Sequence, residues 1–202
     1  MKPVLVSQRV DVISGRNERR DALDQRLAAF LLHCGLLPLP VPNVPEAAKA
    51  MLVSASWYGV VLSGGNDLHA LGGDAPERDA VESLLVSAAI EVGRPVIGIC
   101  RGLQFLVYRD GGTLMPTTGH AATRHRLNLP ERGSVNSYHR WIIKSLPESW
   151  RSLAQAPDAT VEWGCSPGQN LWGVMWHPER ETVWNFLDAE FFRNVFGAGA
   201  VL

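Results

Sequence analysis

Cys100 is the residue of this sequence best suited to act as a nucleophile. It ends the apolar run PVIGI of residues 95–99 and is followed directly by an arginine and a glycine. A strand that turns abruptly into a helix exposes the residue at the turn, and the helix N-terminus beneath it favours a thiolate. Glycines at positions 98 and 102 remove side chains that would collide at such a turn. The alternative is that Cys100 is a small buried hydrophobic residue, as free cysteines in apolar runs most often are.

A cysteine nucleophile needs a base, and the segment GVMWHPERE of residues 173–181 offers a histidine and a carboxylate together. Pro178 forces an extended or turning backbone between His177 and Glu179, so the two side chains can project in the same direction. The carboxylate can then hold one tautomer of the imidazole. Taken singly, each residue also fits a plain structural role, as a hydrogen-bonded strand-end histidine and a solvated charge. Together with Cys100 they predict a nucleophile, its base and the group that orients the base.

The overall composition narrows the kind of protein that carries these residues. The chain has 202 residues, 46% of them apolar and 19% charged, with a formal net charge of −1. These values predict one compact domain over residues 1–202, with ample material for a core. Balanced charge without a basic stripe argues against nucleic acid as a partner, and no apolar run is long enough to cross a bilayer. We therefore expect a small-molecule partner and no membrane partner, and a homo-oligomer stays open. The first residues lack the apolar segment of a secretory signal, which predicts a cytoplasmic location.

The remaining cysteines and two histidines are weaker candidates for chemistry. Cys34 falls near the end of the first predicted helix and Cys165 has no base pattern nearby. Three cysteines at these spacings match no disulfide framework or zinc knuckle. His120 and His125 lie in the polar segment TGHAATRHR and could be metal ligands, but no Cys, Asp or Glu stands beside them at ligand spacing. The sequence therefore predicts a loop or substrate-proximal role for both histidines, and no metal or other cofactor.

The elements that must position these residues alternate between strands and helices, which predicts an α/β domain. Strands are expected at residues 3–8, 35–41, 58–65 and 95–99. Helices are expected at residues 23–35, 79–92, 101–110 and 182–196, and short strands and turns at residues 113–176. In open α/β sheets ligands bind at the carboxyl ends of the strands. Cys100 is therefore expected where a ligand binds.

Three motifs together resemble the class I glutamine amidotransferase superfamily. They are LSGG at residues 62–65, the pattern G-x-C-x-G-x-Q at residues 98–104 and His-Pro-Glu at residues 177–179. The resemblance implies a three-layer α/β/α sandwich, with a mostly parallel flavodoxin-like sheet and a nucleophile elbow.

The same resemblance implies a reaction and the residues that carry it out. Cys100, His177 and Glu179 would form a catalytic triad that cleaves a γ-glutamyl amide through a glutamyl thioester. The backbone N–H groups of Gly65 and Arg101 would form the oxyanion hole. This agrees with the residues themselves, because a double-glycine turn and a helix N-terminus are both ready donors.

Further segments resemble the γ-glutamyl hydrolase branch of this superfamily, of the peptidase C26 type, whose members act alone. These segments are the arginine after Cys100, ERDAVE at residues 77–82 and VNSYH at residues 135–139. The resemblance implies that the glutamate moiety of the substrate is held by a set of polar side chains, namely Gln104, Asn136, Ser137, Tyr138 and His139. Without the resemblance, VNSYH indicates only a polar turn.

The segments SQR at residues 7–9, NERRDALDQR at 17–26, LSGGNDL at 62–68 and MWHPERE at 175–181 extend over essentially the whole chain. They resemble small hydrolases that release glutamate and cytidine diphosphoramidate from γ-glutamyl-CDP-amidate in capsule biosynthesis. Alternatives that stay open are a γ-glutamyl-GABA hydrolase, a glutaminase that delivers ammonia to a synthase, and a non-catalytic or redox-sensing α/β protein. Arg19 and Arg20 follow the first strand, together with Arg9 and Arg16, and would suit the phosphates of a nucleotide leaving group. The structural alternative is a solvated charged loop that leads into a helix.

Overall fold

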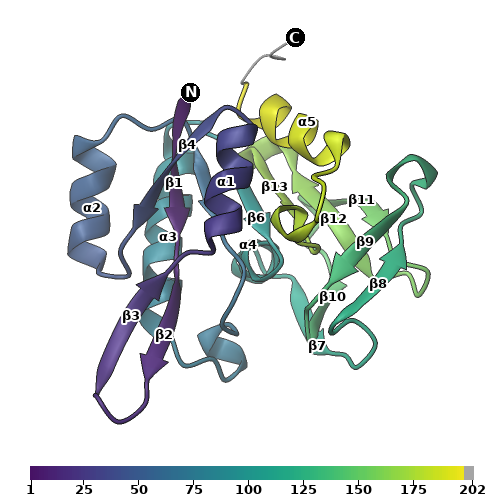
Figure 1. Cartoon of the computed structure of the whole chain (residues 1–202), viewed down its shortest axis with the longest axis horizontal. Helices are drawn as coiled ribbons and strands as arrows, with labels where there is room; N and C mark the ends of the chain where they lie inside the picture. The colour runs from purple at the N-terminus through teal and green to yellow at the C-terminus, as the bar shows by residue number, and fades with distance from the viewer. Residues whose placement is uncertain (198–202) are drawn as a thin grey trace.

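The computed structural model of the protein describes residues 1–197, so the last five residues of the domain expected over residues 1–202 lie outside the described residues. A seven-stranded sheet forms the centre, in the order β11-β12-β13-β6-β5-β1-β4 (Figure 1). Its strands are β1 (Lys2–Ser7), β4 (Leu36–Val41), β5 (Val60–Leu62), β6 (Val96–Ile99), β11 (Arg151–Gln155), β12 (Val161–Ser166) and β13 (Leu171–Val174).

Five neighbouring strands of this sheet, β4, β1, β5, β6 and β13, pair in parallel. Numbered in chain order among themselves they stand as 2-1-3-4-5, which is the flavodoxin-like order that the resemblance implied. β12 and β11 extend the sheet with antiparallel pairs at one edge.

Helices cover both faces of the sheet, which confirms the expected three-layer sandwich. One face carries α1 (Gln25–His33) and α5 (Phe186–Val195), and the other carries α2 (Pro45–Ser54), α3 (Pro76–Glu91) and α4 (Arg101–Arg109). Strand β1 shows why: Val4 and Val6 belong to the first hydrophobic cluster and Leu5 to the second. Successive side chains of a strand point to opposite faces, so an uninterrupted apolar run requires cover on both sides.

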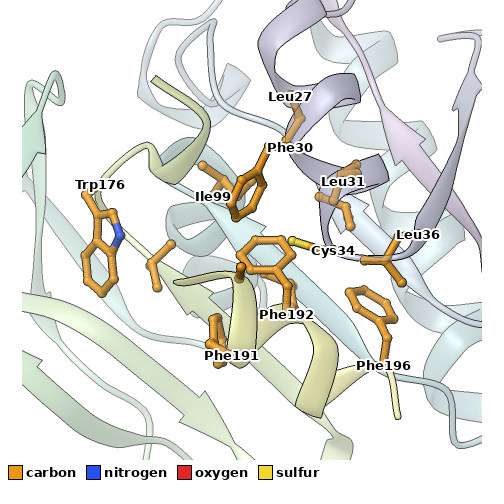
Figure 2. Close-up of a cluster of buried hydrophobic side chains, with 14 of the residues drawn as sticks. Leu27, Phe30, Leu31, Cys34, Leu36, Ile99, Trp176, Phe191, Phe192 and Phe196 are labelled. Atoms are coloured by element: carbon orange, nitrogen blue, oxygen red, sulfur yellow. The ribbon is translucent and has the colours of Figure 1, made fainter. Parts of the chain in front are cut away.

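The core beneath α1 and α5 is built from aromatic and aliphatic side chains (Figure 2). Phe30 of α1 meets Phe192 of α5 edge to face, with ring centroids 5.1 Å apart. Cys34 is enclosed by the same cluster, and burial raises the pKa of its thiol to about 12. A thiol held protonated in this way is a packing residue, which agrees with Cys34 being a weak candidate for chemistry in the sequence.

Two segments differ from the sequence-based expectation. No strand was predicted at residues 9–22, where a solvated charged loop was the structural alternative for the arginines, but β2 (Arg9–Ile13) and β3 (Glu18–Ala22) form an antiparallel hairpin. The side chain of Asn66 accepts a hydrogen bond from the Val10 N–H and donates one to the Val10 carbonyl, so a distant residue docks the hairpin. No helix was predicted for residues 45–54, where α2 begins at Pro45, a position at which the missing N–H costs nothing.

Short strands occupy residues 113–145 beside the β11–β13 edge, as expected (Figure 1). β7 (Thr113–Pro116) pairs with β10 (Trp141–Ser145), and β8 (Thr123–Arg126) pairs with β9 (Ser134–Ser137). Single 3₁₀ turns lie at His69–Leu71, Pro130–Arg132, Pro167–Gln169 and Pro178–Arg180. None of the helices in the described part of the chain is both long and apolar enough to cross a membrane.

Glycines allow α4 to start directly against the strand ends. A Cβ atom on Gly98 would lie 2.4 Å from the carbonyl carbon of Gly102, and one on Gly102 would lie 2.3 Å from the Leu62 carbonyl oxygen. Both contacts are with backbone atoms, which cannot rotate away. The close approach predicted for these two glycines is therefore present.

We expect Gly102→Ala to lower the free energy of unfolding by about 3 kcal/mol, because the added methyl group must push α4 away from β5. Urea denaturation measures the change. Gly168→Ala is the matched control, since a Cβ there meets nothing within 4 Å, and its effect should stay within about 0.5 kcal/mol. Equal stabilities of the two variants would contradict the tight packing at this turn.

Candidate active site

Cys100 occupies the turn between β6 and α4 in a strained backbone conformation. Its φ is 52° and its ψ is −106°, a region that residues other than glycine rarely adopt. The Cys100 N–H donates to the Val174 carbonyl at 2.7 Å, which ties the turn to β13. Backbone strain of this kind persists only where surrounding structure holds it, and it is concentrated at functional sites. The thiol lines a cavity of about 300 Å³ at the carboxyl ends of the strands.

His177 and Glu179 meet at the end of β13. The Nδ1 atom of His177 lies 2.7 Å from Oε1 of Glu179, and both side chains are buried. Pro178 starts a 3₁₀ turn between them, which directs the two side chains to the same side. Gly64 gives the imidazole room, because a Cβ at that position would lie 2.6 Å from Cε1 of His177.

The imidazole of His177 also faces Cys100, so the three residues predicted as a catalytic set come together from two parts of the chain. Burial alone would lower the pKa of His177, but the charges of Cys100 and Glu179 and hydrogen bonds to both raise it to about 10. An imidazole with this pKa is protonated at neutral pH and can stabilise Cys100 as a thiolate. The arrangement therefore places a positively charged imidazole beside Cys100.

The two predicted oxyanion donors border the same cavity. Gly65 has a φ of 86° and follows β5, while Arg101 is the first residue of α4. Neither the Gly65 N–H nor the Arg101 N–H donates a hydrogen bond to any group of residues 1–197. Two unpartnered backbone donors beside a cysteine are suited to stabilise a negatively charged oxygen.

A buried charge cluster that was not predicted from the sequence holds this turn in place. Arg78 donates hydrogen bonds to the carbonyl oxygens of Ser63 and Gly65, each at 2.6 Å, and its Nε donates to Glu82 at 2.9 Å. Glu82 also pairs with Arg101, so one carboxylate connects the β5 turn to the start of α4. The signal was present in ERDAVE, where Arg78 and Glu82 lie one helical turn apart on a face that is otherwise apolar.

Three of the residues predicted to bind the glutamate moiety line the cavity: Gln104, Tyr138 and His139. Gln104 is buried and its Nε2 donates to the Trp141 carbonyl at 3.0 Å, which leaves its amide oxygen to accept a hydrogen bond. Tyr138 is half exposed, and its ring lies edge-on to the His177 imidazole with centroids 5.7 Å apart. These three side chains are placed to contact a bound molecule.

Asn136 and Ser137 lie behind the cavity wall rather than on it. The Asn136 side chain accepts from the His177 N–H at 2.9 Å and donates to the His177 carbonyl at 2.8 Å. The Ser137 hydroxyl donates to the His120 carbonyl at 2.5 Å. Because β9 alternates its side chains, Asn136 positions the histidine backbone while Ser137 faces the opposite side. The structure does not bring either residue to the substrate cavity, so the expectation of direct contact is corrected.

Arg19 and Arg20 also lie away from both the cavity and Cys100. Arg19 on the β2–β3 hairpin pairs with Glu77 at 2.5 Å, and Arg20 pairs with Glu18 on the same strand at 2.7 Å. Each guanidinium group is paired with a carboxylate at the surface, so neither arginine side chain extends toward the cavity. The arginines that border the cavity with Cys100 are instead Arg101, Arg140 and Arg180.

The chain is similar in sequence to one protein family and to individual known proteins. The family model described as peptidase C26 matches residues 6–130 and 121–179. The γ-glutamyl-CDP-amidate hydrolase of Campylobacter jejuni is 33% identical over 128 residues, which span 62% of this chain and 64% of that enzyme, less than two thirds of its length. The γ-glutamyl-γ-aminobutyrate hydrolase of Escherichia coli K12 is 26% identical, with 97% of this chain and 93% of that enzyme covered.

Two solved structures share the fold. A protein assigned to GMP synthase from Thermoplasma acidophilum superposes with a TM-score of 0.69 at 20% identity, covering 98% of this chain and 93% of that one. A glutamine amidotransferase from Thermotoga maritima has a TM-score of 0.64 at 15% identity, covering 88% and 76%. At these identities the likeness concerns the arrangement of the sheet and helices.

Proposed function

The chain belongs to the peptidase C26 family, and we propose that it is a cysteine-dependent hydrolase of γ-glutamyl amide bonds. The observation that carries the proposal is the strained Cys100 turn, with a charged His177 beside it and two free backbone donors at the same cavity. Relatives named for γ-glutamyl-CDP-amidate and γ-glutamyl-γ-aminobutyrate hydrolysis support the substrate class.

In the first half of the proposed reaction, the Cys100 thiolate attacks the γ-carbonyl carbon of the substrate. The carbonyl oxygen becomes negatively charged in the tetrahedral intermediate and accepts hydrogen bonds from the Gly65 and Arg101 N–H groups. The carbon–nitrogen bond then breaks, and His177 gives its proton to the leaving nitrogen. The products of this half are a glutamyl thioester and the free amine or phosphoramidate.

In the second half, neutral His177 takes a proton from a water molecule that attacks the thioester carbon. The carbon–sulfur bond breaks, glutamate leaves, and the thiolate–imidazolium pair is restored. Glu179 keeps the Nδ1 proton of His177 in place throughout, so that Nε2 is the atom that exchanges protons. Asn136 fixes the backbone of His177 from the other side.

For the leaving group we propose a phosphate-bearing one, with γ-glutamyl-CDP-amidate as the first candidate and a role in capsule modification following from it. Two observations support this choice: the Campylobacter relative, and the guanidinium groups of Arg140 and Arg180 at the cavity. Arg180 stacks over the Tyr138 ring, 4.9 Å from its centroid, which keeps its charge at the opening. A cytoplasmic location remains a prediction from the sequence, and a homo-oligomer stays open.

The test of the reaction class is turnover by the purified chain alone. γ-Glutamyl-CDP-amidate, γ-glutamyl-GABA, folyl polyglutamate and glutamine should be compared side by side by glutamate release and mass spectrometry. Rapid quenching should reveal a covalent glutamyl adduct on Cys100. If glutamine were the one compound of the four to be hydrolysed, and only after a synthase was added, the protein would be an ammonia-delivering glutaminase instead. No adduct with any of the four compounds would overturn the proposal.

Replacing Arg140 with glutamine should lower kcat/KM selectively for the phosphate-bearing substrate, by about tenfold at low salt. The loss should shrink at high ionic strength, because an exposed charge is then screened. γ-Glutamyl-GABA should be affected much less. Arg20→Gln is the matched control, since Arg20 pairs with Glu18 away from the cavity. Equal losses on both substrates would show that Arg140 does not recognise phosphate.

A further inference from the structure

Three histidines and a glutamate gather behind the cavity wall, between the β8–β9 pair and the edge of the main sheet. His120 precedes β8, His125 lies on β8, His139 follows β9, and Glu162 lies on β12. All four side chains are buried or nearly so, with Glu162 at 0% exposure. The sequence shows no carboxylate near His120 and His125, so no metal site was expected there. Strand pairing brings Glu162 between the two histidines, and a metal site has to be considered again.

The ligand-capable atoms of this cluster converge on one carboxylate oxygen. Oε1 of Glu162 lies 3.4 Å from Nδ1 of His120, 3.3 Å from Nε2 of His125 and 3.3 Å from Nε2 of His139. The ligand atoms of His120, His125 and Glu162 all lie within 4.8 Å of one another. Nitrogen and oxygen ligands at about 2.0–2.2 Å from a tetrahedral zinc ion are themselves about 3.3–3.5 Å apart. Each nitrogen-to-Oε1 distance is therefore close to the separation of two ligands on one zinc ion, and His120, His125 and Glu162 form the compact ligand set, with His139 beside it.

These converging atoms have no other partner. Nδ1 of His120, Nε2 of His125, Nε2 of His139 and both carboxylate oxygens of Glu162 make no hydrogen bond within residues 1–197. Within the same residues, no lysine or arginine lies within 4 Å of Glu162, whose ion-pair neighbours are the three histidines. A fully buried carboxylate without hydrogen bonds is costly unless a positive charge compensates it. A positive charge at this point, on an imidazole or on a bound cation, would stabilise the carboxylate, and the neighbouring histidines lower the pKa of Glu162 against its burial.

In His120 and His139, the ring nitrogen that faces away from Glu162 lies within hydrogen-bond distance of an oxygen atom, as is common for histidines that bind a metal. Nε2 of His120 lies 2.8 Å from Oδ2 of Asp158, and Nδ1 of His139 lies 3.0 Å from the Trp141 carbonyl. With the ring protons on these outward nitrogens, Nδ1 of His120 and Nε2 of His139 carry free lone pairs that point at Glu162. Outer carboxylates and carbonyls commonly set the tautomer of zinc-binding histidines in this manner.

We propose that His120, His125, His139 and Glu162 bind one divalent zinc ion. His120, His125 and Glu162 supply two imidazole nitrogens and a carboxylate oxygen, a set that zinc accepts, and His139, which approaches the same carboxylate oxygen, would complete a four-coordinate site. The ion would join β8, the end of β9 and β12. His139 also lines the cavity that contains Cys100, and the Trp141 carbonyl that holds His139 also accepts from Gln104. Zinc would therefore stiffen one wall of the cavity.

Metal analysis of the untagged protein tests the proposal directly. After removal of metal with a chelator and dialysis against zinc, we expect close to one zinc ion per chain and a rise in Tm, since an ion that binds only the folded state stabilises it. Cobalt(II) should substitute with the intense visible absorption of a tetrahedral site. Glu162→Gln and His125→Ala should each weaken zinc binding by about tenfold or more. His33→Gln, which changes an exposed histidine on α1, should bind zinc as the wild type does.

Zinc below about a tenth of an equivalent in the wild type after dialysis would overturn the proposal, as would undiminished binding in both cluster variants. The cobalt spectrum of the wild type keeps the test decisive if a variant fails to fold, because a weak octahedral spectrum would contradict the predicted shell. The metal content and Tm are measured without substrate. The result is therefore independent of the hydrolase activity proposed above.

Discussion

Replacing Cys100 with alanine should reduce glutamate release from a γ-glutamyl amide by roughly 10⁴-fold or more, because it removes the nucleophile and the reaction has no other route to the thioester. The fold should be retained, since the change deletes one sulfur atom and opens only a small cavity. Steady-state kinetics with circular dichroism on the same samples measures both effects. Cys165→Ala is the matched control: Cys165 is also buried, and burial raises the pKa of its thiol.

The other two members of the site should show graded losses. His177→Ala should be nearly as damaging as the cysteine variant, because both proton transfers depend on the imidazole. Glu179→Gln keeps an acceptor for the His177 Nδ1 proton but loses the charge that supports the imidazolium, so a measurable remainder of activity is expected. Full activity of the Cys100 or the His177 variant would refute the proposed mechanism.

A titration gives a second readout of the same pairing. The charges of Cys100 and Glu179, acting against burial, raise the His177 pKa to about 10. In Cys100→Ala the first of these charges is absent, so the pKa of His177 should fall toward its ordinary value. The imidazole resonances followed by NMR against pH measure the change. An unchanged His177 pKa in the variant would show that Cys100 and His177 are not electrostatically coupled, and would contradict the ion pair.

The largest effect on stability is expected from Glu82→Gln, which should lower the free energy of unfolding by about 3–5 kcal/mol. The substitution leaves the buried guanidinium groups of Arg78 and Arg101 without the carboxylate that pairs with both. The cost of burying Arg78 is visible already in the wild type, where burial and the charge of Arg101 lower its pKa to about 10. Urea denaturation at neutral pH measures the loss. Glu77→Gln is the control on the same helix, because Glu77 pairs with Arg19 at the surface and should contribute less than about 1 kcal/mol.

The pH dependence of this effect has a definite sign. Burial alone would raise the pKa of Glu82, but the charges of Arg101 and Arg78 lower it below its ordinary value of 4.5. A carboxylate with a lowered pKa stabilises the fold fully above the unfolded-state pKa and loses that contribution as pH falls through the folded-state pKa. The stability difference between wild type and Glu82→Gln should therefore be constant at neutral pH and shrink only in acid. A difference that grows as the pH is lowered would be incompatible with this pairing.

The same variant should also reduce activity without touching the substrate. Arg78 holds the Ser63 and Gly65 carbonyl oxygens while it pairs with Glu82, so loss of that pair should loosen the turn that presents the Gly65 N–H. An oxyanion donor that is poorly positioned costs transition-state stabilisation, so the loss should fall on kcat rather than on KM alone. An effect confined to stability would show that Arg78 and Glu82 serve the fold only.

The sequence by itself determined the layered fold and the strand-to-helix turn that carries Cys100. Val4, Leu5 and Val6 are all apolar, and a short run of this kind is typical of a strand covered on both sides. Cys100 between glycines at the end of such a strand predicted the turn, because only small neighbours tolerate so close a start of a helix. Both features depend on residues that are close neighbours in the chain, and spacing between close neighbours can be read directly from a sequence.

Only the tertiary structure decided which polar side chains meet. Arg19 and Arg20 looked suited to phosphates, but the hairpin pairs them with Glu77 and Glu18, and Arg140 reaches the cavity instead. The hairpin is itself held by Asn66 from a distant loop. Side-chain direction on short irregular strands depends on register, and a shift of one residue reverses every direction. Register is set by packing between distant segments, so it cannot be read from the segment alone.

The histidine cluster shows the same limit most clearly. His120 and His125 displayed no neighbouring carboxylate in the sequence, yet Glu162 of β12 lies between them once β8, β9 and the main sheet are assembled. Glu162 gave no local signal, because a single glutamate in an otherwise apolar strand has the same pattern whether it faces solvent or a buried site. Burial without a hydrogen-bond partner is what distinguishes the two cases, and burial is a property of the assembled layers rather than of any one stretch of sequence.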